Sequence, residues 1–316
     1  MAKPARLIAS AVLFNLLNAG SASAHPSGLQ AGDAWWLAWH FDSLVAVNVL
    51  LLAVLYGRGL VRVWGRAGFG RVVARWRAVA FGTGLLALMV ALMSPLDTLA
   101  EDLSWVHMTQ HMVLMVVAAP LMMAGSAGLV ITWSLPLRWR QVVWHGLRPI
   151  KLGSRLRLRF LLWNPLWVWT LHAVGLWVWH LPVLYELALS DPLVHDLEHL
   201  TFFLVACLFW RVVIDSRVRP TLNPGLSIFY LFTTSLHAMV LGVLMALSPR
   251  VWYPTYVGRT ERWGLSPLAD QQLAGLIMWM PACMVYAVIG TALFASWLHQ
   301  MEQADSQPRP VADSAV

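Results

Sequence analysis

The sequence predicts an all-α integral membrane protein, a bundle of seven transmembrane helices that follows an N-terminal signal peptide. Of its 316 residues 59% are hydrophobic and only 12% are charged, against about 25% charged in a soluble domain. Because this number of polar groups cannot cover the surface of a folded chain in water, lipid is the expected solvent. The 19 tryptophans agree, because indole favours the headgroup interface. The net charge of +7 comes from bases in short loops between apolar stretches, so no nucleic-acid partner is expected.

The first 24 residues have the three parts of a signal peptide. Lys3 and Arg6 supply the basic region, a short apolar run follows, and Ala22-Ser23-Ala24 fits the small-x-small cleavage rule. The run is too short for a comfortable membrane span. Residues 25–41 are then expected to be a periplasmic segment that precedes the first span.

Seven later stretches are long and apolar enough to cross a hydrocarbon core of about 30 Å. They lie near residues 42–64, 76–94, 104–134, 162–181, 193–214, 226–247 and 270–298. The third is over-long and contains Pro120, Gly125 and Gly128, so it is expected to kink or to continue as a second apolar piece. Together the spans form a predicted membrane domain of residues 42–298, and residues 299–316 are expected to be a disordered cytoplasmic tail.

The connections between the spans alternate in charge, which predicts the orientation of the chain. The first and third connections carry arginines and no acids, whereas the second and fourth carry acids and no bases. Cytoplasmic loops are enriched in basic residues, so the first, third and fifth connections are expected in the cytoplasm. The mature N-terminus is then periplasmic and the C-terminus cytoplasmic, as the signal peptide also predicts.

Two of the predicted spans carry an H-x-x-x-H pair near the same side of the membrane. His107 and His111 begin the third span, and His195 and His199 begin the fifth, where Glu198 stands beside them. Residues four apart share one helix face and lie about 6 Å apart along its axis. Facing helices of a bundle commonly build metal sites from such side chains. We therefore expect the four histidines to converge on one outward-facing metal site; the alternative is a polar network that fixes helix packing.

Five further side chains lie near this site or deeper in the spans and are considered with it. Met115 continues the stripe of the first histidine pair one turn deeper, and Met112 lies on the neighbouring stripe. His180 ends the fourth span on the outer side, with His172 about 12 Å deeper, and His237 lies midway along the sixth span. A single histidine in a membrane helix is often only a hydrogen-bonding partner, and methionine is common core filler.

The donor types favour copper as the metal. Imidazole suits zinc, copper, iron and nickel, while thioether sulfur selects monovalent copper, so methionines beside the histidines favour copper. Haem is the main rival, since paired histidines on membrane helices can ligate it axially. A di-iron centre has less support, because Glu198 is one acid where such bundle sites supply several.

Enzymatic and thiol chemistry have little support in the sequence. No nucleophile triad, P-loop or dinucleotide-binding fingerprint is evident. Cys207 and Cys283 lie far apart inside apolar segments, so thiol-based metal or redox chemistry is not expected. We therefore expect a protein that is not an enzyme.

Four stretches of the sequence resemble one known family, the CtaG family of bacterial cytochrome c oxidase assembly factors. They are SPLDTLAEDLSWVHMTQHMVLMVVAAPLMMAG, HDLEHLTFFLVACLFW, LGVLMALSPRVWYPTY and SPLADQQLAGLIMWMP. The resemblance covers about residues 35–300 and implies seven spans in the bacterial inner membrane. It also implies a role in maturing haem-copper oxidase, with His107, His111, His195 and His199 as the functional positions.

Two functions remain open on this basis. The first is an assembly factor that handles copper for the oxidase copper centre, with oxidase subunits, periplasmic copper carriers and membrane lipid as its partners. The second is a membrane oxidoreductase or electron carrier that binds haem b or a di-iron centre through the paired histidines. A permease is a weaker third reading, because no charged pathway crosses the bilayer and no inverted repeat is evident.

Overall fold

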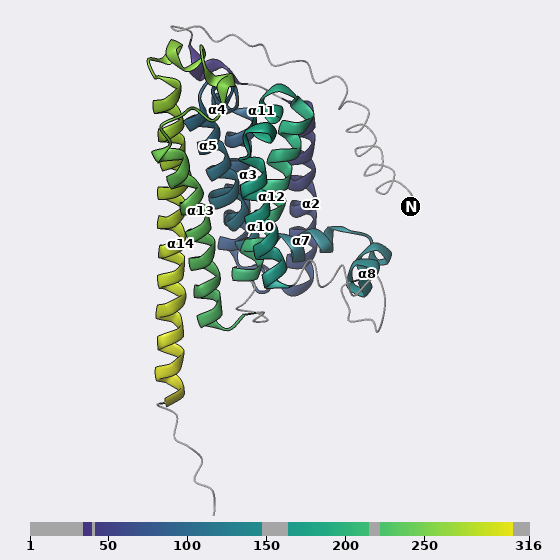
Figure 1. The fold of residues 1–316 in the computed structure, drawn as a ribbon. Coiled ribbons are helices and arrows are strands. Elements are labelled where there is room, and N and C mark those ends of the chain that lie inside the picture. The colour runs from purple at the N-terminus through teal and green to yellow at the C-terminus, as the bar shows by residue number, and fades with distance from the viewer. Residues whose placement is uncertain (1–33, 40–41, 147–163, 215–221, 306–316) are drawn as a thin grey trace, which may run out of the picture.

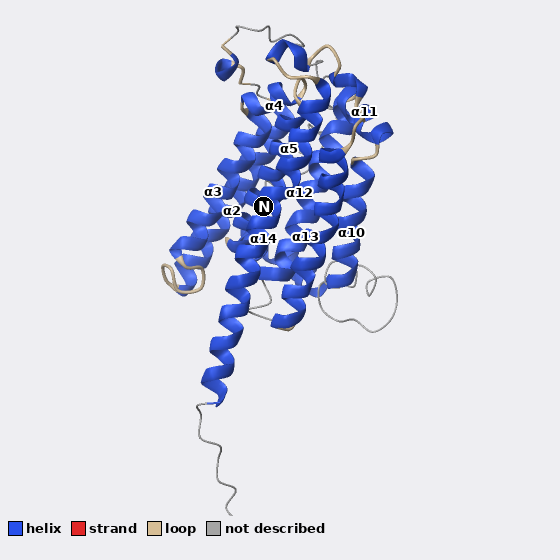
Figure 2. Ribbon diagram, turned by 60° about the vertical axis from the view of Figure 1, so that its left-hand side comes forward, coloured by secondary structure: helices blue, strands red, loops and turns tan. Residues whose placement is uncertain are grey.

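The computed structural model describes residues 34–39, 42–146, 164–214 and 222–305, and within these ranges every regular element is a helix (Figures 1 and 2). The predicted signal peptide and His25, the residue that follows its predicted cleavage site, lie outside the described residues. The α-helices are α2 (Ser43–Ala67), α3 (Arg75–Met93), α4 (Pro95–Ala100), α5 (Ser104–Met112), α6 (Ala119–Ala124), α7 (Ala127–Ser134), α8 (Leu137–Gly146), α10 (Pro165–Trp179), α11 (Pro182–Ser190), α12 (Pro192–Ile214), α13 (Pro224–Leu247) and α14 (Pro267–Asp305). Short segments complete the fold: η1 (Trp35–Leu37), η2 (Val113–Ala118), η4 (Pro254–Tyr256) and η5 (Thr260–Trp263).

The helices confirm a multi-pass membrane protein. Six helical segments of the described chain are long and apolar enough to cross a membrane, and a seventh span results if α10 and α11 count as one bent span. The bend between α10 and α11 measures 73°. Pro182 begins α11 and holds Leu181 in an extended conformation, because a residue before proline disfavours the helical region. The sequence did not predict α11, which lies in the fourth connection.

Consecutive spans run in opposite directions, so the connections separate into two groups. In Figure 1, α4 and α11 lie at one end of the bundle, and α8 and the C-terminal end of α14 lie at the other. The segment η4 contacts α11, and η5 contacts the start of α14. The starts of α5 and α12, with their histidine pairs, belong to the end that carries α4 and α11.

The predicted break in the third span is confirmed. The helix runs from α5 through a π-helical segment, η2, into α6, and then turns at Ser126, whose φ is +57°. Pro120 has no N–H to donate, and a π-helical turn is one way to absorb that loss. The indole of Trp210 donates to the Met115 carbonyl at 2.8 Å. A side chain of α12 thereby gives a hydrogen bond to a backbone carbonyl that the π-helical turn leaves without one.

The last helix is longer than predicted. Helix α14 continues to Asp305, so the prediction of a disordered tail from residue 299 was wrong for residues up to 305. The helix leaves the bundle at its C-terminal end (Figure 1). The part of the predicted tail after residue 305 lies outside the described residues.

Helices α13 and α14 approach each other closely through glycines. A Cβ on Gly275 would lie 2.6 Å from both the Ala246 nitrogen and the Gly242 carbonyl oxygen. Small residues permit this approach between membrane helices, where packing replaces the hydrophobic effect as the driving force. The largest buried cluster includes residues of α5, α10, α12, α13 and α14. Two of these helices, α5 and α12, carry the two histidine pairs.

Candidate metal centre

Helices α5 and α12 bring the two predicted histidine pairs together. The rings of His107 and His111 have centroids 4.3 Å apart, and those of His195 and His199 are 4.2 Å apart. Across the two helices, His107 lies 5.4 Å from His195, and His111 lies 5.2 Å from His199. Both H-x-x-x-H faces therefore point at each other, as the helical spacing requires.

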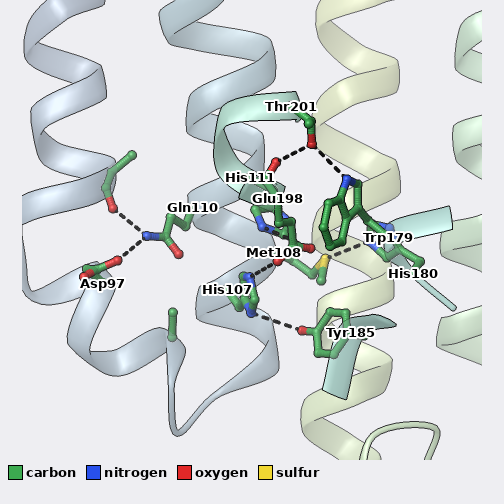
Figure 3. Close-up of polar contacts among 12 residues, drawn as sticks. Asp97, His107, Met108, Gln110, His111, Trp179, His180, Tyr185, Glu198 and Thr201 are labelled. Carbon is green, nitrogen blue, oxygen red and sulfur yellow. Dashed lines mark hydrogen bonds and ion pairs between the residues drawn. The ribbon is translucent and has the colours of Figure 1, made fainter. Parts of the chain in front are cut away.

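Glu198 completes the cluster from the face of α12 that meets α5. One of its carboxylate oxygens lies 3.8 Å from Nε2 of His107, and the other lies 3.9 Å from Nε2 of His111 (Figure 3). Two overlapping sets of three donors result: His107 with His195 and His199, and His107 with His111 and Glu198. Within each set the donor atoms lie within 4.8 Å of one another, so each set could close around one ion.

The cluster is buried rather than open, which differs from the expected outward-facing cavity. His107 and Glu198 have no exposed surface, and His111 and His199 are also buried. His195 is the half-buried member. The reason is that α11 and the segment around η4 cover this end of the bundle, and the sequence did not predict that cover.

Several polar atoms of the cluster have no hydrogen-bond partner. They are Nε2 of His107, both ring nitrogens of His111, Nε2 of His199 and both carboxylate oxygens of Glu198. A buried donor or acceptor without a partner costs about 1–3 kcal/mol, and more for a charged group. A bound cation would take up one lone pair from each imidazole and from the carboxylate together, while the second nitrogen of each neutral ring carries a proton. The donor set therefore fits a metal ion.

Tyrosines hold the other ring nitrogen of His107. Its Nδ1 lies 3.3 Å from the hydroxyl oxygens of both Tyr185 and Tyr256 (Figure 3 draws the Tyr185 contact). Those hydroxyls lie 3.2 Å apart, and Tyr256 donates to the Ala100 carbonyl at 3.2 Å. Burial raises the pKa of Tyr256 well above its usual value, so this hydroxyl keeps its proton. The chain of bonds favours a proton on Nδ1 and a free lone pair on Nε2, the arrangement that metal-binding histidines adopt.

Polar contacts also fix the helix that carries His107. The Asp270 carboxylate accepts from the backbone nitrogens of Ser104 at 2.7 Å and Trp105 at 3.3 Å, which caps the start of α5. Gln110, on α5, donates to the Asp97 carboxylate at 2.7 Å (Figure 3). Asp270 on α14 and Asp97 on α4 thus orient α5. The spacing of residues in the sequence does not predict these contacts. The residues that make them, and Tyr256, nevertheless lie in three of the four stretches that resemble the family.

Of the remaining candidates, only His180 lies beside the cluster. His180 joins the edge of the cluster: its ring lies 6.4 Å from His111, and its Nε2 lies 3.4 Å from the sulfur of Met108. Met112 and Met115 are buried in the hydrophobic cluster of the bundle. His237 lies elsewhere, beside His172 at a ring separation of 5.7 Å.

Fold and site together define a class of protein: a multi-pass helical membrane protein with a buried histidine and carboxylate cluster that could hold a metal ion. The chain belongs to the family of cytochrome c oxidase caa3 assembly factors (Caa3_CtaG), whose pattern it matches over residues 54–300. The resemblance seen in the sequence is thereby confirmed over most of the chain.

The relatives found by sequence comparison are mycobacterial. The chain is 29% identical over 290 residues to an uncharacterized protein of Mycobacterium leprae, covering 89% of this chain and 42% of the relative. It is 28% identical over 286 residues to an uncharacterized protein of Mycobacterium bovis, covering 87% and 42%. The chain thus spans less than half the length of these curated relatives. No solved structure shows a significant match.

Proposed function

We propose that this protein is a non-enzymatic assembly factor that handles copper for the copper centre of a haem-copper cytochrome c oxidase. Membership of the assembly-factor family supports the oxidase. The observation that carries the metal role is the pair of overlapping three-donor sets that share His107. Oxidase subunits and periplasmic copper carriers are its proposed partners.

The two donor sets differ in burial, which suits transfer. His195 is half-buried, whereas His111 and Glu198 are fully enclosed. An ion that enters at His195 can exchange one ligand at a time for a deeper one while His107 stays bound. Transfer to or from a partner then never passes through a free ion.

The charge of the cluster favours a monovalent ion. Four imidazoles are neutral when they ligate a metal, and Glu198 supplies one negative charge. A single positive charge makes the loaded site neutral, which matters because unbalanced charge is costly in a buried site. Monovalent copper meets this condition, and imidazole is among its ligands.

The ring packing supports haem and di-iron less well. The histidine rings lie 5.2 to 5.9 Å apart across the two helices, and the Glu198 carboxylate lies within 3.9 Å of Nε2 of both His107 and His111, in the space that a porphyrin plane would need. A di-iron centre in a helical bundle takes several carboxylates, and the described cluster offers Glu198. The oxidoreductase reading therefore has no observation in its favour.

The charge of the loops supports one orientation. Their alternation favours a periplasmic position for the histidine end of the bundle, where carriers could reach His195. Periplasmic reporter fusions after Asp102, Asp191 and Glu261 should be active, and a fusion after Arg75 should be silent. The reverse pattern would put the cluster on the cytoplasmic side and remove the proposed route.

The test of this function is the metal content of the oxidase. We expect oxidase purified from a deletion strain to contain haem but to lack much of its copper, and extra copper in the medium should restore it in part. A strain with His107→Leu should behave like the deletion, and a strain with His299→Leu, an exposed histidine, should behave like the wild type. Full copper content with lost activity would instead favour a haem-handling or scaffolding role.

A further inference from the structure

A second pair of histidines lies between α10 and α13, apart from the cluster described above. His172 and His237 face each other with ring centroids 5.7 Å apart and planes inclined at 64°. Phe209 packs on His172 at 4.9 Å, and Trp169 packs on His237 at 5.5 Å. Aromatic rings therefore flank the pair, and no ion pair with either histidine ring is found in the described part of the chain.

This pair leaves buried nitrogens without partners. His172 is only 3% exposed. Its Nδ1, both ring nitrogens of His237 and Nε1 of Trp169 are buried and make no hydrogen bond. Two histidines that merely packed two helices together would be expected to bond each other or the backbone. Each neutral imidazole keeps one lone pair, so the two rings together offer two, which points to a ligand that accepts lone pairs; the Trp169 N–H is only a donor and carries no part of this inference.

We propose that His172 and His237 form a second metal site, a two-coordinate site for monovalent copper inside the bundle. Two metal–nitrogen bonds of about 2 Å separate the ring centres by on the order of 6 Å, close to the observed 5.7 Å. Monovalent copper accepts two nearly linear ligands. Zinc requires about four, which the pair does not offer.

The apolar surroundings select the charge of the ion. The Born cost of burying an ion rises with the square of its charge, so a divalent ion would cost about four times as much as a monovalent one. Among the described residues neither ring forms an ion pair with a carboxylate, unlike the rings that Glu198 contacts in the first cluster. Haem is disfavoured because Phe209 and Trp169 occupy the flanks of both rings.

This site stands independently of the copper role of the first cluster, and the test separates the two. Purified protein in detergent is loaded anaerobically with monovalent copper and titrated with the chelator bicinchoninate. The variant His172→Leu with His237→Leu should bind one copper ion fewer per chain than the wild type. The exposed control His299→Leu should bind the wild-type amount.

A second variant keeps the proposal testable even if that double substitution perturbs folding. In His107→Leu with His199→Leu the remaining copper should show two nitrogen ligands in its X-ray absorption spectrum. Unchanged copper in the His172/His237 variant, or no copper in the His107/His199 variant, would overturn the second site and leave a bound water as its occupant. Copper lost only from the His172/His237 variant would support the second site and refute the first.

Discussion

Replacing Glu198 by Gln should weaken metal binding while leaving the metal-free bundle as stable as before or more so. The substitution keeps the shape of the side chain and removes one buried negative charge. The carboxylate oxygens lie 3.8 and 3.9 Å from the nearest histidine nitrogens, so a bound ion lies about 4 Å away or closer. At an effective dielectric constant of about 20, two unit charges at 4 Å interact by about 4 kcal/mol.

Part of that energy is offset, because the amide oxygen that replaces the carboxylate still presents a lone pair and a dipole to the ion. We therefore expect a loss of about 2–4 kcal/mol in binding free energy, which is roughly a 30- to 1,000-fold weaker dissociation constant. For the metal-free protein, a buried charge replaced by a neutral group is often neutral or stabilising. The two effects have opposite signs, and together they distinguish a ligand or counter-ion from a packing residue.

The assay is chelator competition for monovalent copper in detergent, with thermal unfolding of the metal-free protein measured in parallel. Glu302→Gln is the matched control, because the Glu302 side chain is 79% exposed and lies far along α14 from the cluster. Unchanged copper affinity in Glu198→Gln would refute the charge argument. A fall in metal-free stability with no fall in affinity would assign Glu198 to packing.

Three further substitutions test the support of the site. Tyr256→Phe removes one hydroxyl beside His107 Nδ1 and should weaken copper binding about 10-fold, measured by the same competition; an unchanged affinity would separate the tyrosines from the site. Asp270→Asn should lower the free energy of unfolding by about 1 kcal/mol through the weaker cap of α5, seen as a lower melting temperature, and no change would refute the capping role. Trp210→Phe leaves the Met115 carbonyl unpaired and should cost about 1–3 kcal/mol of stability; a stability equal to wild type would show that the π-helical turn needs no support.

The periodicity of the sequence predicted the part of the site that lies along single helices. An H-x-x-x-H pair must share a helix face, so the pairing within α5 and within α12 followed from spacing alone. The break after α6 also followed, because proline and glycine act locally. The pairs met across the bundle as expected, although spacing alone cannot specify how two helices rotate against each other.

The segments that cover the histidine cluster could not be predicted, because their contacts join residues that are far apart in the sequence. Tyr185 comes from a helix that begins where Pro182 bends the chain, and Tyr256 comes from the connection before α14. Apolar spacing in either segment gives no sign that both hydroxyls reach His107. The buried state of the cluster follows from this cover, which explains why an open cavity was expected instead.

Copper X-ray absorption on the purified, copper-loaded protein tests the central claim most directly. We expect nitrogen or oxygen donors at about 2 Å with the scattering of imidazole, and loss of part of that signal per protein chain in the variant His107→Leu with His199→Leu. The signal that remains in the variant should come from a two-coordinate ion. A spectrum dominated by sulfur, or one that is identical in the wild type and the variant, would contradict a copper site built from the histidines of α5 and α12.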